Sequence, residues 1–174
     1  MDGEVITQRE GRELRLLVAE PDLAITWSRY AAGERGADLH VHREHVDAFY
    51  VVEGELTFRV GPDAERLALA AGGYVAIPPN VVHAFDNDAA TTVEYLNFHA
   101  PDGGFGDYLR AARDGRKAAF DSFDPPADGG RRAADATVLE TLVEAGLGRL
   151  RVGADGSPPP AARFTFGDLW VAAR

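Results

Sequence analysis

Residues 14–100 alternate between short apolar runs and turn residues, with a pitch of about ten residues. The runs are dense in β-branched and aromatic residues, which favour strands. Glycine, proline or Asn/Asp separates most of them, as at Gly61-Pro62 and Asn87-Asp88. We expect no amphipathic helix between them, so the pattern predicts an antiparallel sandwich or barrel. The predicted strands are 13–19, 24–31, 38–42, 47–53, 55–61, 65–70, 73–78, 81–87 and 91–100.

The pattern changes after residue 100. Residues 105–120 carry apolar side chains at helical spacing and predict a short helix. Residues 133–148 have an apolar face and glycines near their end, which predicts a second helix. Between them, 121–132 is rich in Pro, Gly and Asp and is interpreted as a loop. Residues 163–172 are apolar enough to dock, as a strand against the barrel or against a partner subunit.

Length and composition are those of a soluble globular chain. It has 174 residues, 45% of them hydrophobic and 26% charged. This length fits one domain with an appended segment. We expect a β-barrel over 1–104 and a helical and irregular extension, packed on it, over 105–174.

Charge and cysteine usage exclude several function classes. The net charge of -10 argues against nucleic-acid and anionic-membrane partners. The chain has no cysteine, which excludes disulfides, thiolate catalysis and Cys-based zinc sites. Neither a signal peptide nor an apolar run long enough to span a bilayer is visible, so we expect a cytoplasmic protein.

The stretch "HVHREHVDAFYVVEG" (40–54) concentrates candidate metal ligands. His40 and His42 are two residues apart, so on a strand their imidazoles project from the same face. Asp47 follows at the start of the next strand, and a fourth candidate, His83, lies in "IPPNVVHAF". Four ligands of this N/O type suit Fe, Ni, Mn, Cu, Co or Zn, and ligand type alone does not choose among these metals.

The spacing of these residues resembles two motifs of the cupin superfamily. The first motif is H-x-H, then Glu after three or four residues, then Gly after six more; its counterparts here are His40, His42, Asp47 and Gly54, with Asp in place of Glu. The second is G-x5-P-x-G-x2-H-x3-N; its counterparts are Gly72, Pro78, Asn80, His83 and Asn87, with Asn in place of Gly. Asn tolerates a left-handed turn better than most residues, so this exchange is physically mild.

The resemblance, which covers about residues 14–100, implies a fold and a ligand set. The fold would be all-β: a cupin-type double-stranded β-helix, or jelly roll, here with short C-terminal helices. Most such barrels bind a divalent metal inside, and the ligands carried over are His40, His42, Asp47 and His83. Asp47 would also be the catalytic base, while hydrogen bonding to a ligand histidine is its alternative role.

Several neighbouring residues have weaker assignments. His45 shares parity with Asp47 and is kept as an alternative ligand, although a surface or loop position is the simpler interpretation. Glu44 has the opposite parity and is expected to face solvent. His99 is expected to be a polar residue near the barrel mouth.

Two further expectations concern the pocket. Phe49 and Phe85 have inward parity near the metal site and are expected to line a pocket as well as the core. For Arg29, a surface salt bridge is more common than a contact with an anionic substrate.

Within this superfamily, the chain most resembles small single-domain cupins similar to quercetin dioxygenases. It implies a metal-dependent oxygenase acting on a flavonol-like or enediol-like small molecule. One alternative is a non-redox isomerase, epimerase or cyclase; another is a non-catalytic cupin that binds a small ligand or a metal. An exposed edge strand invites pairing, so a homodimer is expected.

Overall fold

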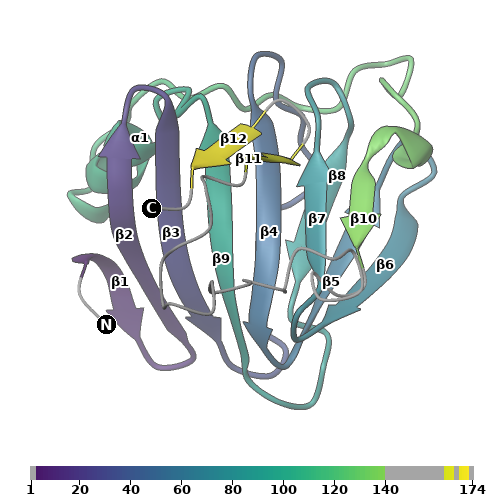
Figure 1. Cartoon of the computed structure of the whole chain (residues 1–174). Helices are drawn as coiled ribbons and strands as arrows, with labels where there is room; N and C mark the ends of the chain where they lie inside the picture. Colours follow the sequence, from purple (N-terminus) through teal and green to yellow (C-terminus); the bar gives the residue numbers. More distant parts are fainter. Residues whose placement is uncertain (1–2, 140–162, 167–168, 173–174) are drawn as a thin grey trace, which may run out of the picture.

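A computed structural model describes residues 3–139, 163–166 and 169–172. Antiparallel strands form a seven-stranded sheet, with the order β1-β2-β3-β9-β4-β7-β10, and a three-stranded sheet, with the order β6-β5-β8 (Figure 1). The larger sheet contains β1 (Glu4–Arg9), β2 (Arg12–Glu20), β3 (Leu23–Tyr30), β4 (Val46–Glu53), β7 (Tyr74–Ile77), β9 (Val93–Ala100) and β10 (Thr137–Leu139). The smaller one contains β5 (Glu55–Val60), β6 (Glu65–Ala70) and β8 (His83–Asp86).

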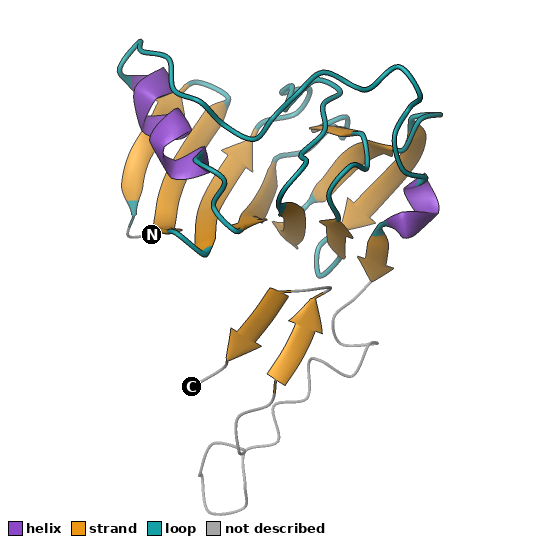
Figure 2. Cartoon of the chain, turned by 90° about the horizontal axis from the view of Figure 1, so that it is seen from above, coloured by secondary structure: helices purple, strands orange, loops and turns teal. Residues whose placement is uncertain are grey.

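Neighbours in these sheets come from distant parts of the chain. β9 lies between β3 and β4, and β5 pairs with both β6 and β8. The chain passes back and forth between the two antiparallel sheets, as β4 to β5 and β7 to β8 illustrate. This arrangement is a double-stranded β-helix, so the predicted jelly-roll fold is confirmed. Figure 2 shows the sheets from above, with the loops gathered along one side of the barrel.

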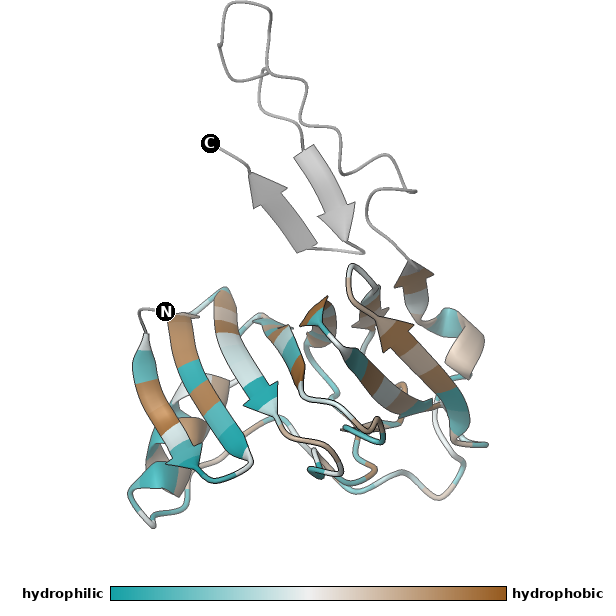
Figure 3. Ribbon diagram, turned by 90° about the horizontal axis from the view of Figure 1, so that it is seen from below, coloured by the Kyte–Doolittle hydropathy of each residue, from teal (hydrophilic) through white to brown (hydrophobic). Residues whose placement is uncertain are grey.

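The main core lies between the two sheets. Phe49 and Val51 of β4 meet Leu56 and Phe58 of β5, and all four are fully buried. Along β9, buried and partly buried positions alternate, as in a strand with one face toward the core. The strands next to the N-terminus show this alternation in Figure 3, where hydrophobic and hydrophilic segments follow one another.

A second apolar cluster attaches the helix α1 (Phe105–Arg113) to the larger sheet. Phe105 and Leu109 of α1 pack against Ile6, Leu16 and Ala24 from β1, β2 and β3. The predicted helix in 105–120 is therefore present, and its first residue lies beside the barrel interior.

Most predicted strands agree with the structure to within one or two residues, but three predictions are wrong. Residues 38–42 form only isolated bridges, at His40 and Val41. Within 133–148, the described part is a short 3-10 helix, η1 (Ala133–Asp135), and the strand β10, which pairs with β7. The remainder of that predicted helix lies outside the described residues. Strand β1 was missed because its sequence, EVITQR, is largely polar.

Two strands are described within residues 163–172. β11 (Arg163–Phe166) and β12 (Leu169–Ala172) form a two-stranded antiparallel sheet with each other, so strand structure is present, while docking against the barrel or a partner subunit stays a prediction. Among the described helices, none has the length and apolar character needed to cross a membrane.

Candidate metal centre

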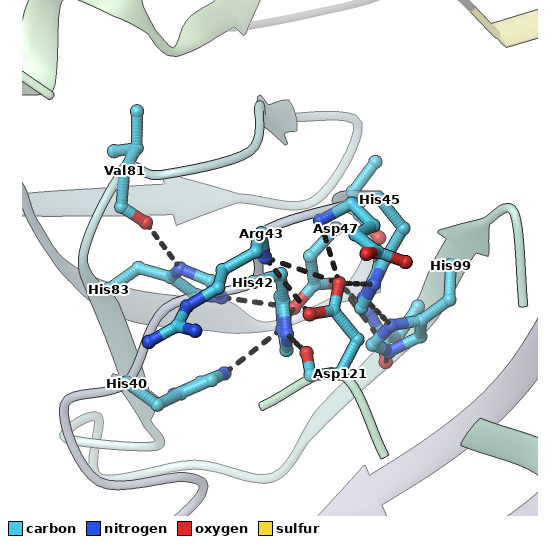
Figure 4. A network of polar contacts seen from close by, with 12 residues as sticks. His40, His42, Arg43, His45, Asp47, Val81, His83, His99 and Asp121 are labelled. Atoms are coloured by element: carbon cyan, nitrogen blue, oxygen red, sulfur yellow. Dashed lines mark hydrogen bonds and ion pairs between the residues drawn. The ribbon is translucent and has the colours of Figure 1, made fainter. Parts of the chain in front are cut away.

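All five histidines of the chain gather in one cluster inside the barrel, although they come from distant segments (Figure 4). Four of them are almost fully buried, with 1–3% of their surface exposed; these are His42, His45, His83 and His99. The structure brings the four predicted ligands together. One ligand atom from each lies within 4.8 Å of the others; the residues are His40, His42, Asp47 and His83.

The backbone around the cluster explains how a loop presents two ligands. His40 and His83 face each other across an isolated antiparallel bridge, and each backbone N–H donates to the other's carbonyl at 2.9 Å. Val41 forms a second bridge to Phe123. These contacts hold residues 40–42 extended, so the two imidazoles still project together although the predicted strand is absent.

Hydrogen bonds fix the tautomer of each of the three predicted ligand histidines. The Nδ1–H of His40 donates to the carbonyl of Asp38 at 2.7 Å, and that of His83 donates to the carbonyl of Val81 at 3.0 Å. His42 Nδ1 donates to the carbonyl of Asp121. Because a carbonyl oxygen can only accept, the proton sits on Nδ1 and each neutral ring keeps a lone pair on Nε2.

These lone pairs converge with one carboxylate oxygen. The Nε2 atoms of His40 and His42 are 3.2 Å apart. Asp47 Oδ2 lies 3.1 Å from His83 Nε2 and 3.5 Å from His42 Nε2. Ligand atoms about 2.0–2.2 Å from one ion are separated by comparable distances, so the donor set fits a divalent transition metal.

The charges in the cluster favour the metal-binding forms of His40 and Asp47, whereas they favour the protonated form of His42. Burial is the main cause that lowers the pKa of His40 to about 4, and it keeps this ring neutral. Burial by itself raises the pKa of Asp47, but the nearby His99 and hydrogen bonds with His42 and His83 hold it well below its usual range. Against the cost of burial, the contact with Asp47 raises the pKa of His42. A cation in this position replaces protons as the partner of the buried carboxylate.

Asn97 on β9 orients Asp47, and sequence reasoning missed it. Its Nδ2 donates to Asp47 Oδ1 and to the carbonyl of Ala48, the latter at 3.2 Å. This contact engages one carboxylate oxygen and leaves Oδ2 turned toward the histidines. The available signal was parity: on β9, Asn97 shares a face with the buried Tyr95 and His99.

The positions of His45 and His99 correct two expectations. His45 is 1% exposed and is not a surface residue, and His99 is 3% exposed, deep within the cluster instead of at its rim. Their rings contact each other, with His45 Nε2 at 2.8 Å from His99 Nδ1. Glu44, in contrast, faces solvent as predicted.

Asp121 explains why His45 turns inward. It comes from the segment that was interpreted as a plain loop. Its carboxylate accepts the backbone N–H groups of Arg43 and Glu44, at 3.1 and 2.8 Å, and it contacts His45 Nδ1 at 2.8 Å. Burial opposes ionisation, but these contacts lower the pKa of Asp121. The extension therefore holds the ligand loop from outside.

The cluster opens into a cavity of about 810 Å³. His40, His42, Asp47 and His99 belong to its wall. One part of the lining is aromatic and another bears hydroxyl groups; the aromatic residues include Phe85, Phe105, Tyr108, Phe120 and Phe123, and the hydroxyl groups belong to Thr26, Ser28, Tyr30 and Tyr95. Such a cavity accommodates a small molecule with a flat apolar part and several polar groups.

Two pocket expectations can be compared with this lining. Phe85 lines the cavity as predicted, whereas Phe49 is 0% exposed within the core and is not part of the wall. Arg29 pairs with Glu94 at 2.7 Å and is half exposed, so it forms the surface salt bridge that was considered more common.

Comparisons with known proteins describe the central part of the chain. Residues 26–99 match the sequence model of the family described as "Cupin domain". Among curated proteins, none matches this chain.

Similar solved structures include KdgF from Halomonas sp., at 20% identity and a TM-score of 0.49 over 56% of this chain and 84% of that one. Another is an RmlC-like cupin from Shewanella frigidimarina NCIMB 400, at 27% identity and a TM-score of 0.48 over 57% and 84%. A third is a sugar phosphate isomerase of the cupin superfamily from Silicibacter pomeroyi, at 21% identity and a TM-score of 0.46 over 52% and 60%.

Proposed function

We propose that this protein, whose residues 26–99 match the cupin domain model, is a metal-dependent enzyme that acts on a small molecule. The observation that carries the proposal is the convergence of three Nε2 lone pairs and one carboxylate oxygen, beside a cavity that His40, His42 and Asp47 line. His40, His42, Asp47 and His83 would hold the ion. Ligand chemistry leaves its identity among Fe, Ni, Mn, Cu, Co and Zn.

For the reaction we propose an oxygenase acting on a flavonol-like or enediol-like substrate. The aromatic wall, with Phe85, Phe105 and Phe120, supports stacking of a flat ring system. The hydroxyl groups of Ser28 and Tyr95 line the same cavity and suit a substrate with several oxygen atoms. When bound, the metal supplies Lewis acidity toward a substrate hydroxyl and a meeting point for the substrate and O₂.

Asp47 is the chain's candidate for taking the hydroxyl proton. It is ionised, because its surroundings hold its pKa well below the usual range. A carboxylate with a low pKa is a weak base, so it accepts only a proton that is already acidified. Asn97 keeps the carboxylate in one orientation, with Oδ2 toward the ligand histidines. Asp47 therefore serves both as ligand and as proton acceptor in this proposal.

The test compares wild-type protein with Asp47→Asn. Metal content is measured by elemental analysis of natively purified protein, and O₂ uptake is followed with a panel of flavonols and enediols. We expect stoichiometric metal and O₂ uptake in the wild type, and loss of O₂ uptake in Asp47→Asn. Absence of O₂ uptake with every substrate would refute the oxygenase.

His99 favours a second candidate, a non-redox isomerase, epimerase or cyclase. It lines the cavity beside Asp47, and its Nε2 lies 3.7 Å from Asp47 Oδ1. Two proton-transfer groups at one cavity are what proton removal and return at adjacent atoms require. Substrate conversion without O₂ would support this candidate. A protein that binds its metal and small molecules but converts none of them would instead be the non-catalytic binding cupin.

A homodimer stays a prediction, and we propose it together with this function. Sedimentation of the purified chain tests it, and a monomer at all concentrations would contradict it.

A further inference from the structure

The buried imidazoles of His45 and His99 lie next to the proposed metal centre, and a ring nitrogen of one faces a ring nitrogen of the other. His45 Nδ1 lies 2.8 Å from a carboxylate oxygen of Asp121, which is within hydrogen-bond distance. This carboxylate already accepts the backbone N–H groups of Arg43 and Glu44, so it acts as an acceptor and His45 carries its proton on Nδ1. Its Nε2 then has a lone pair.

The orientation of Asn97 makes the same demand on His99. Both donor positions of the Asn97 amide are directed, since Nδ2 donates to Asp47 and to Ala48. Its Oδ1 therefore faces His99 Nε2, at 2.9 Å, and accepts a proton from it. In a neutral His99, this leaves the lone pair on Nδ1.

The two lone pairs consequently point at each other across 2.8 Å, from His45 Nε2 to His99 Nδ1. Either a bound proton or a metal ion beside these two atoms relieves the repulsion between the lone pairs. The pattern is that of metal-bound histidines, whose second ring nitrogen donates to a carboxylate or a carbonyl-type oxygen. Asp121 and Asn97 supply those two outer acceptors.

A third imidazole completes the set. His42, His45 and His99 offer ligand atoms that all lie within 4.8 Å of one another. Because His42 donates its Nδ1 proton to the Asp121 carbonyl, it offers Nε2. The rings of Phe105 and Phe120 close the site, at 3.7 Å between the ring centres of His99 and Phe105. Figure 4 shows His45 and His99 side by side, with Asp121 adjoining them.

We infer that His42, His45 and His99 form a second metal position that takes a transition-metal ion of the type that prefers imidazole, such as Cu²⁺, Zn²⁺ or Ni²⁺. The two positions share the Nε2 lone pair of His42, so one ion occupies either set and both are not filled together. The inference rests on the proposed metal centre only through His42.

The test removes the two ligands that belong to the first position alone. In His40→Ala/His83→Ala, the second set is intact, and we expect about one Cu²⁺ per chain bound through nitrogen ligands. Adding His99→Ala removes the second set, and we expect metal binding to be lost. Elemental analysis after gel filtration gives the stoichiometry, and EPR of the Cu²⁺ form shows the nitrogen ligands. Circular dichroism confirms that each variant is folded.

A single substitution serves if the double variant does not fold. If the Cu²⁺ ion of the His83→Ala variant stays at the first position, it has two nitrogen ligands, from His40 and His42. If the ion moves to the second position, it has three. EPR distinguishes these counts. Asp121→Ala provides a further test, because it removes the partner of His45 and the acceptor of the Arg43 and Glu44 N–H groups but keeps the backbone carbonyl on which His42 depends. We expect it to weaken the second position about 10- to 100-fold.

The outcomes separate the two proposals. A folded His40→Ala/His83→Ala protein that binds no metal, or a His83→Ala protein with two nitrogen ligands, would overturn the second position; the gap between His45 and His99 would then hold a proton. Neither result affects the first position, whose test is the metal content and turnover of the wild type.

Discussion

Asn97→Ala is expected to weaken metal binding at the first position, although Asn97 is not a ligand. The amide of Asn97 donates to Asp47 Oδ1 and to the Ala48 carbonyl, and it accepts from His99 Nε2. Without it, Asp47 loses the contact that keeps Oδ2 toward His83 and His42. The carboxylate can then rotate. Metal binding must therefore also fix its orientation, and this entropic cost weakens the affinity.

The magnitude follows from the contact that is lost. A hydrogen bond to a charged group contributes about 1.5–3 kcal/mol. Since about 1.4 kcal/mol corresponds to a tenfold change in Kd, the expected loss is roughly 10- to 100-fold. Removal of an outer partner of a metal ligand has an effect of the same size in general, about 10- to 100-fold.

The assay is the Kd for Zn²⁺, measured at neutral pH by competition with a chromophoric chelator. Asn87→Ala is the matched control. Asn87 is also fully buried, and its Nδ2 donates to the carbonyls of Tyr30, Ala31 and Thr91, away from the cluster. We expect Asn87→Ala to lower the melting temperature and to leave the Kd unchanged. A folded Asn97→Ala protein with wild-type Kd would refute the positioning argument, and so would equal weakening in both variants.

Three further predictions concern stability. Burial lowers the pKa of His40 to about 4 and of His99 to about 3, from 6.5, so unfolded chains bind more protons below pH 6.5. The metal-free protein should lose stability as pH falls from about 6.5 to 4, by at most about 1.4 kcal/mol per pH unit per histidine, and a urea midpoint that is flat over this range would contradict this. Zn²⁺ at about 100 times its Kd should add about 2.7 kcal/mol, seen as a rise in melting temperature that a chelator reverses; an unchanged melting temperature would argue against binding. Gly36→Ala should cost about 1–3 kcal/mol in chemical denaturation, because its Cβ would lie 2.2 Å from the Phe85 carbonyl oxygen; wild-type stability would show that the loop yields freely.

Much of the barrel could be predicted because its signals are local. Strand composition and turn residues are read within about ten residues, and they located most strands correctly. The turn at Asn80 illustrates this: Asn was expected to tolerate a left-handed conformation there, and its φ is 68°. The spacing of His40, His42, Asp47 and His83 is likewise visible in the sequence, and the structure places these residues together.

The surroundings of the site could not be predicted, because they depend on contacts between distant residues. Strand parity requires an extended backbone, and residues 43–45 form a loop, so parity does not determine which way His45 points. The carboxylate of Asp121 determines it, and this residue lies 76 positions further along the chain. Apolar spacing located the α1 helix, but the contact of Phe105 with His99 follows from tertiary packing.

The same contacts bear on whether an aspartate can serve where the cupin motif has glutamate. Asp47 is 2% exposed, with Oδ1 on Asn97 and Oδ2 3.1 Å from His83 Nε2, so the shorter side chain already reaches its partners. Asp47→Glu would carry the carboxylate past the atoms of Asn97 and His83 that it now contacts, a misfit that costs about 1–3 kcal/mol. We therefore expect it to weaken Zn²⁺ binding about tenfold, a change of about 1.4 kcal/mol, instead of improving it. Zn²⁺ binding as tight as in the wild type, in a protein of unchanged melting temperature, would show that the site has room for glutamate and that Asn97 does not fix the reach of the carboxylate.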